Sequence, residues 1–141
     1  METIELLKRF IRYWQTSDWE SFDNLLGENV ELELPWLITT IKLKINFILF
    51  FKKTKKANSS LVFELEKFVG SDKHSVITGI SHGKNGIFCA PNVNLEDGYE
   101  TGKYAFIFVF EWDNKKLDRL IVNDCFVQNS NTVINDWISQ I

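Results

Sequence analysis

Asp124 is the acidic residue whose surroundings in the sequence best suit chemistry. It alternates with Leu120, Val122 and Phe126, and alternate residues of a β-strand share one face. A carboxylate on such an apolar face must be hydrogen-bonded, ionised toward water or raised in pKa, and a raised pKa suits a general base. The alternative interpretation is a strand-end aspartate exposed at the rim of a sheet, and the pattern is compatible with both. The opposite face carries other residues that are polar enough to line a pocket: Arg119, Asn123 and Cys125.

The two histidines and the two cysteines do not form a recognisable site. His74 and His82 share a face of one expected strand, but at roughly 3.3 Å per residue they lie about 26 Å apart, too far for one site unless the strand bends. Each is interpreted as an exposed or turn histidine. Cys89 and Cys125 belong to no C-x-x-C motif and have no histidine at metal-ligand spacing. We therefore expect two reduced, packed thiols, no metal and no cofactor.

The composition fits one domain that spans residues 1–141. This length suffices for a hydrophobic core without disulfides or metal. The formal net charge of −3 provides no excess of positive charge for a phosphate backbone, which disfavours nucleic acid as a partner. Twelve Phe and five Trp exceed the needs of a small core, which indicates that some rings also line a cavity or a subunit interface.

No segment has the pattern of a targeting or membrane-spanning sequence. The stretch METIELLKRF is charged and lacks the apolar region of a signal peptide. The longest apolar stretch, residues 45–51, is interrupted by Asn46 and is far shorter than the roughly 20 residues of a membrane span. We therefore expect a cytoplasmic protein without a membrane span.

Two helices are expected at the start of the chain. Apolar residues recur at helical spacing over residues 4–15, which predicts a helix buried along much of its girth. Ser17 and Glu20 have the spacing of a capping box, in which the hydroxyl and the carboxylate each bind an amide of the first turn of the next helix. Gly27 lies where a left-handed C-terminal cap would be needed.

The next segment begins with a strand and continues ambiguously. Residues 30–34 alternate apolar and charged side chains before Pro35, which predicts a half-buried strand that ends at the proline. Residues 37–51 fit one helical face, although residues 41–45 also alternate as a strand would. We favour a helix because the apolar run is long. The lysines that follow are expected at a solvated helix end or, alternatively, on an amphipathic helix that lies on a membrane surface. They are Lys52, Lys53, Lys55 and Lys56.

The rest of the chain has a β pattern. Residues 83–102 form a loop without a clear period, and residues 134–141 suggest a short final helix. Four strands are expected, separated by turns that contain Gly, Asp and Asn: residues 61–69, 74–82, 104–112 and 117–127.

Two stretches, together with the order of the elements, resemble a known family. Residues 9–30 contain an aromatic helix, a short polar turn with Asp18, and Leu-Leu followed by an acidic residue and Val. Residues 101–124 contain Thr-Gly-Lys, a strand, a turn at Asp113-Asn114 and a second strand. These features resemble the nuclear transport factor 2-like superfamily, which includes ketosteroid isomerases, scytalone dehydratases, limonene epoxide hydrolases and SnoaL-like polyketide cyclases.

The resemblance covers nearly the whole chain and implies a particular architecture. It implies a cystatin-like α+β fold, in which N-terminal helices pack inside a curved antiparallel sheet that forms a cone. It also implies that ligands enter at the open end of the cone. Because such folds host unrelated functions, the activity has to be inferred from the residues of the site.

The resemblance places no catalytic residue where ketosteroid isomerase chemistry needs one. That reaction uses a general-base Asp and an oxyanion hole made by a Tyr and a protonated Asp. In the register that aligns Asp18 and Pro35 with the family pattern, Phe10 stands at the position of the Tyr and Leu34 at that of the base. Residues 103–110, where the third carboxyl would lie, contain no Asp or Glu. The sequence therefore predicts no ketosteroid isomerase activity.

The leading hypothesis is a protein that binds an apolar, ring-containing small molecule. In the family that the chain resembles, the first helix and the end of the first strand line the cone, and binding sites are generally apolar cavities with few polar groups. Asp124 would be the one ionisable group of this pocket. Six further residues are expected to contact the ligand: Phe10, Trp14, Leu34, Trp36, Tyr104 and Asn123.

Two other functions remain open. One is a SnoaL-like cyclase, hydrolase or dehydratase with Asp124 as the general base and Tyr104, Asn123 or His82 as its partner. The other, also implied by the resemblance, is a protein–protein adaptor. A buried carboxylate with a hydrogen-bonding partner would favour the enzyme, and an exposed hydrophobic patch would favour the adaptor.

A homodimer joined through the sheet is expected from the strand over residues 104–112. Both faces of this strand are apolar, and an antiparallel sheet in a monomer leaves one face to water. Five aromatic side chains at roughly 150–250 Å² each approach the area that one subunit buries in a standard interface. One face carries Tyr104, Phe106, Phe108, Phe110 and Trp112, and the other carries Ala105, Ile107 and Val109.

Overall fold

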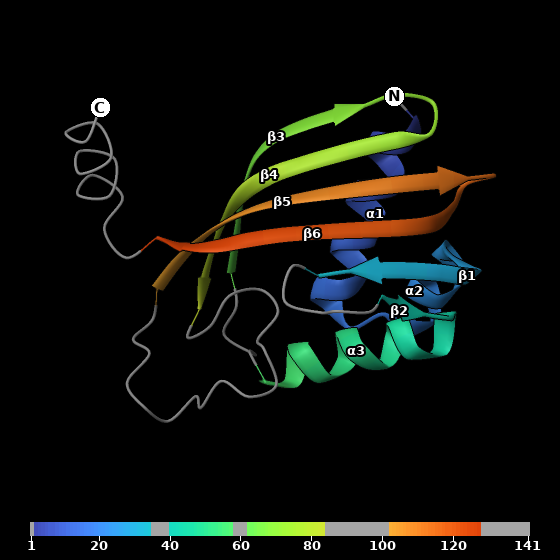
Figure 1. Ribbon diagram of the computed structural model, residues 1–141, viewed down its shortest axis with the longest axis horizontal. Helices are drawn as coiled ribbons and strands as arrows, with labels where there is room; N and C mark the ends of the chain where they lie inside the picture. Colours follow the sequence, from blue (N-terminus) through green and yellow to red (C-terminus); the bar gives the residue numbers. More distant parts are fainter. Residues whose placement is uncertain (1, 35–39, 58–61, 84–101, 128–141) are drawn as a thin grey trace.

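The computed structural model describes residues 2–34, 40–57, 62–83 and 102–127. In these ranges the chain forms three helices and one six-stranded sheet, which confirms the α+β class (Figure 1). The elements are, in chain order, α1 (Glu2–Thr16), α2 (Trp19–Leu25), β1 (Leu26–Glu33), β2 (Ile41–Lys42), α3 (Lys44–Ala57), β3 (Val62–Gly70), β4 (His74–Gly83), β5 (Gly102–Asp113) and β6 (Lys116–Val127).

The sheet contains both antiparallel and parallel pairs, because β1, the first long strand, pairs in parallel with β6, the last strand. The strand order is β2-β1-β6-β5-β4-β3. Strands β3 to β6 pair antiparallel in chain order, whereas β1 runs parallel to β6 with Leu32 opposite Leu120. This parallel pair departs from the antiparallel sheet expected from the sequence. A parallel pair needs a long connection between its strands, and here β2, α3 and strands β3 to β5 lie between β1 and β6 in the chain. Figure 1 shows α1 behind the curved sheet and α3 below it, next to β2.

Aromatic rings around Phe10 fill the space between the helices and the sheet. Phe10 is fully buried, and its ring centroid lies 4.9 Å from that of Phe22 in α2 and 5.1 Å from that of Phe110 in β5. The ring of Phe51 in α3 meets it edge to face at 5.5 Å, a favoured geometry for aromatic pairs. Phe10 therefore links all three helices to the sheet.

The turn between α1 and α2 differs from the sequence prediction. The N-cap of α2 is Asp18, whose carboxylate accepts a hydrogen bond from the amide of Ser21. Ser17 has a positive φ of 59°, and its hydroxyl accepts a hydrogen bond from Lys55. The predicted capping box of Ser17 and Glu20 is therefore wrong, because a lysine distant in sequence binds the hydroxyl that would have capped the helix.

The predicted left-handed cap at Gly27 is also wrong. Helix α2 ends at Leu25, and its C-cap residue Leu26 has the extended backbone of a strand. Gly27 lies within β1, where a Cβ atom would lie 3.1 Å from the carbonyl oxygen of Leu117. The glycine thus permits the close approach of β1 and β6.

Helix α3 begins later than predicted and buries a different face. Residues 41–42 pair with β1 as a short strand, and the helix starts at Lys44. Residues 37–39 of the expected helix lie outside the described ranges. In the observed helix, Phe47 and Phe51 are fully buried, whereas Ile45 is 74% exposed. Rings bury more apolar area than Ile or Leu, which favours the phenylalanine face.

None of the helices described is both long and apolar enough to cross a membrane. The loop predicted over residues 83–102 falls almost wholly outside the described residues, as do the final helix at 134–141 and the candidate ligand contact Trp36.

Gly79 in β4 lets the sheet bend around the ring of Phe106. A Cβ atom at this position would lie 2.3 Å from the backbone oxygen of Glu64 and 2.8 Å from the Phe106 ring. The pairing of β3 with β4 shifts register between Leu65 and Lys67, and such a bulge increases the local twist of a sheet. A side chain at position 79 would push β3 or the ring away.

We predict that Phe10→Ala lowers the free energy of unfolding by about 3–5 kcal/mol, because it leaves a cavity among rings from three helices and the sheet. Urea denaturation measures the loss. Tyr13→Ala in the same helix is the matched control, since Tyr13 is only partly buried, and it should cost about 1 kcal/mol. Equal losses for the two variants would contradict the central position of Phe10.

Candidate functional site

Three of the predicted ligand contacts belong to the packed core. Phe10 is 0%, Trp14 2% and Leu34 6% exposed. Trp14 packs edge to face against Phe51, with their ring centroids 5.0 Å apart. The structure thus gives these residues a packing role, and their contact with a ligand stays a prediction.

Two rows of residues cross the sheet toward the end of β4 and the beginning of β5. In the first row Ser81 lies opposite Tyr104, and in the second Gly79, Phe106 and Asp124 lie opposite one another. The backbone register therefore brings Asp124 and Tyr104 into neighbouring rows, as a shared site requires. Their side chains, and that of His82, lie outside the described part of the structure.

Asn123 lies on the other face of β6. It is opposite Ile107, and both side chains are exposed. Phe106 and Val122, their neighbours along the two strands, are buried. Asn123 is therefore on the convex face of the sheet, away from the aromatic core.

Ser81 is the candidate residue that sequence reasoning missed. Its side chain is 0% exposed, and its hydroxyl has no hydrogen-bond partner within the described ranges. Ser75 on the same face of β4 is different, because Trp112 Nε1 donates a 2.8 Å hydrogen bond to its Oγ. A buried polar group without a partner costs about 1–3 kcal/mol, so Ser81 calls for an explanation. In the sequence it is only one more small polar residue of a strand.

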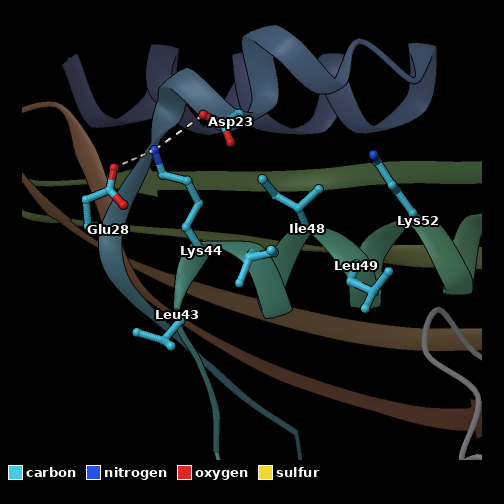
Figure 2. A pocket seen from close by; sticks show the side chains of 8 residues that line it. Asp23, Glu28, Leu43, Lys44, Ile48, Leu49 and Lys52 are labelled. Atoms are coloured by element: carbon cyan, nitrogen blue, oxygen red, sulfur yellow. Dashed lines mark hydrogen bonds and ion pairs between the residues drawn. The ribbon is translucent and has the colours of Figure 1, made fainter.

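A hollow of about 590 Å³ lies on the other side of the molecule, between α2, the start of β1 and α3 (Figure 2). Lys44 closes one end, because its Nζ lies 3.3 Å from Asp23 Oδ1 and 3.2 Å from Glu28 Oε1. Burial by itself would lower the pKa of Lys44, but hydrogen bonds and charge attraction from Glu28 and Asp23 outweigh it and raise the pKa above its ordinary value. Eight residues line the hollow: Asp23, Glu28, Leu43, Lys44, Ile45, Ile48, Leu49 and Lys52.

Lys55 ties α3 to the end of α1. Its Nζ donates hydrogen bonds to the carbonyl oxygen of Trp14 at 2.9 Å and to the hydroxyl of Ser17 at 2.6 Å. Such carbonyls at a helix end lack intrahelical partners and lie at the negative end of the helix dipole. Burial lowers the pKa of the Lys55 ammonium. This lysine, expected from the sequence to be solvated, therefore has a structural role.

The convex face ends in a group of charged residues around Arg119. Its Nη2 lies 3.0 Å from Glu33 Oε1, and its Nε lies 3.7 Å from carboxylate oxygens of Glu31 and Glu111. His74 Nε2 lies 3.6 Å from Glu111. Among the residues that can be described, no three His, Cys, Asp or Glu side chains are arranged to hold a metal ion.

Solved structures with the same arrangement of elements define the fold. The sequence matches no protein-family model and no curated protein sequence. A nuclear transport factor 2-like protein of unknown function from Cytophaga hutchinsonii superposes with a TM-score of 0.66 at 12% identity, over 89% of this chain and 99% of the other. Bal32a, from a soil-derived mobile gene cassette, gives 0.69 at 14% identity over 87% and 88% of the two chains.

An LEH-like epoxide hydrolase from M. tuberculosis is also similar. It gives a TM-score of 0.65 at 11% identity, over 99% of this chain and 94% of the other. At such identities the similarity shows the fold. The chain has a nuclear transport factor 2-like fold, as the resemblance drawn from its sequence implied.

We predict that Lys44→Met lowers the free energy of unfolding by about 0.5–1 kcal/mol at neutral pH, since its two carboxylate partners are largely solvated. The folded-state pKa of Lys44 is raised above 10.5. Its stabilisation is therefore complete below that pH and is lost as the pH rises through the raised pKa. Urea denaturation across this range measures it. Lys53→Met is the control, and an equal, pH-independent loss in both variants would refute the assignment.

Proposed function

We propose that the concave face where β4 ends and β5 begins binds an apolar, ring-containing small molecule. The observation that carries this proposal is the buried hydroxyl of Ser81, which has no hydrogen-bond partner among the described residues. A ligand with one polar group beside a ring would satisfy this hydroxyl and place its ring against the neighbouring row, which contains Phe106. The fold supports the proposal only in general terms, because it hosts many functions.

A second proposed function is chemistry at the same face, with Asp124 as the general base. The strand register favours it, since Asp124 lies opposite Phe106 and one row from Tyr104. A carboxyl group beside an apolar ring has its pKa raised when it is desolvated, as a general base requires. The reaction class would be that of a SnoaL-like cyclase, hydrolase or dehydratase. Tyr104 would be the partner, because the register places Asn123 and His82 in rows of the opposite face.

Neither function includes ketosteroid isomerisation. Phe10 is enclosed by protein rings and carries no hydroxyl, and Leu34 is a buried hydrocarbon. Neither side chain donates or accepts a proton. Loss of a single oxyanion-hole donor already costs roughly 10²–10³ in rate, and here the base is absent as well.

Titration with 2-naphthol and naphthalene tests the ligand proposal, because the two differ only by a hydroxyl. We expect saturable binding of both, detected by their fluorescence. Ser81→Ala should weaken 2-naphthol by about 3–10-fold through the loss of one hydrogen bond, and should leave naphthalene unchanged. Ser75→Ala is the matched control, since the hydroxyl of Ser75 already binds Trp112. If neither compound binds, or if Ser81→Ala weakens both equally, the proposal fails.

Asp124→Asn separates binding from chemistry. The substitution should leave the affinity for naphthalene almost intact, because it removes charge without removing volume. Any hydrolase or dehydratase activity of the native chain should disappear. A model ketosteroid belongs in the same assays, and isomerisation above background would show that the register used for Phe10 and Leu34 is incorrect.

We also propose a homodimer joined through the convex face of the sheet. The aromatic residues of β5 with described side chains are buried against the core, so the aromatic area considered from the sequence is not left for a partner. The convex face is aliphatic instead, and Ile107 is 47% exposed. Four aliphatic residues form one row across four strands, Val69, Val76, Val109 and Ile121.

Ile107→Glu should dissociate this dimer, because it places a charge in the middle of the proposed contact. Sedimentation equilibrium at micromolar concentration should give a dimeric mass for the native chain and a monomeric mass for the variant. Ile45→Glu is the control, since Ile45 is exposed on α3, away from the sheet. A monomeric native chain at this concentration would exclude the proposed interface.

A further inference from the structure

Helix α3 is apolar on both of its sides. Phe47 and Phe51 face the core and are fully buried, whereas Ile45 is 74% and Leu49 48% exposed. Leu43, in the turn before the helix, is 50% exposed and has a positive φ of 75°. Figure 2 shows Leu43 and Leu49 extending away from α2, while Ile48 and Lys52 point toward it. An aliphatic ridge, Leu43, Ile45 and Leu49, therefore projects from the outer side of α3.

The same segment carries a concentration of positive charge. Residues 42–57 contain six lysines and no acidic residue, in a chain whose net charge is −3. Lys44 is paired with Asp23 and Glu28, and Lys55 binds the end of α1. Lys53 and Lys56 are exposed, and their helical spacing from Leu49 places them on the same outer side of α3 as the aliphatic ridge.

We propose that the outer side of α3 docks on an anionic lipid bilayer. Leu43, Ile45 and Leu49 would enter the boundary between headgroups and acyl chains, and Lys53 and Lys56 would contact the headgroup phosphates and carboxylates. Apolar side chains beside lysines on one exposed helix face are the features by which a helix lies on such a surface. Anionic lipids also attract each lysine close to the surface.

The shape of the ridge favours a bilayer over a protein partner. Leu43, Ile45 and Leu49 border the open hollow beside α2, yet Ile45 projects so far that three quarters of it is exposed. A bilayer receives projecting side chains and requires no matching cavity. The local excess of lysines complements a negatively charged surface. Because salt screens charges that are separated by more than about a Debye length, this local excess acts at close range, although the chain as a whole is acidic.

Co-sedimentation of the full chain with vesicles tests the proposal. Phosphatidylcholine vesicles with about 30% phosphatidylserine should bind the chain at least about tenfold more tightly than pure phosphatidylcholine. Raising the salt from about 0.1 M to about 0.5 M should weaken the binding several-fold by screening. Absence of binding to the anionic vesicles would overturn the proposal.

Two double variants locate the contact on α3. Ile45→Ser with Leu49→Ser, and Lys53→Glu with Lys56→Glu, should each reduce binding to the anionic vesicles by about tenfold or more. All four side chains are exposed, so the variants should fold, and unfolding curves check this. Binding equal to that of the native chain in both variants would refute the α3 assignment.

The controls place comparable changes on β3 and the turn that follows it. Leu65→Ser removes an exposed aliphatic residue, and Lys67→Glu with Lys73→Glu reverses two exposed charges; both proteins should bind vesicles as the native chain does. A loss as large as that of the α3 variants would mean that overall charge or hydrophobicity, and not this helix, governs binding. Saturable binding of an acidic amphipathic peptide, without vesicle binding, would overturn the bilayer proposal in favour of a protein partner.

Discussion

The packing of aromatic rings around Phe10 is the interaction on which the rest of the structure depends. Rings from α2, α3 and β5 all contact this residue, so none of these elements can shift without disturbing the others. The same rings occupy the interior of the cone. The ligand site that we propose lies outside this cluster, at the end of β4 and the start of β5. Core packing thus gives Phe10 a structural role, and its hydrocarbon ring has no group that could donate or accept a proton.

The sequence predicted strands β3 to β6 well because their signal is local, whereas β1 begins four residues before the predicted strand and β2 lies in the predicted helix. Alternation and turn residues place β3 to β6 within one or two residues of their observed bounds. The register of α3 was not predictable in this way, since Ile45 and Leu49 compete with Phe47 and Phe51 at helical spacing and only three-dimensional packing selects the rings. Ser17 failed as a cap for a similar reason, because Lys55 binds it from a distant part of the chain. The hydroxyl of Ser81, which has no partner in the described part of the chain, stands out only because it is buried, and no short motif encodes burial.

Helix α3 connects the interior with the outer surface. Its inner phenylalanines complete the core, Lys55 fixes the end of α1, and Lys44 holds α2 and β1 together through Asp23 and Glu28. These contacts anchor the helix from both sides. Residues that project outward from α3 are therefore held on a rigid support. A contact made through them does not have to order the helix first, so little binding free energy is lost to that ordering.

The parallel pairing of β1 with β6 has a consequence for how the chain is made. A ribosome delivers α1, α2 and β1 well before β6, which is the strand that β1 must pair with. Until then the nascent chain carries a helical hairpin rich in aromatic residues, whose covering strands do not yet exist. Contacts between segments so distant in sequence also close slowly. This protein would accordingly depend on chaperones that shield early apolar segments, and its yield in a cell would respond to the speed of translation through β5 and β6.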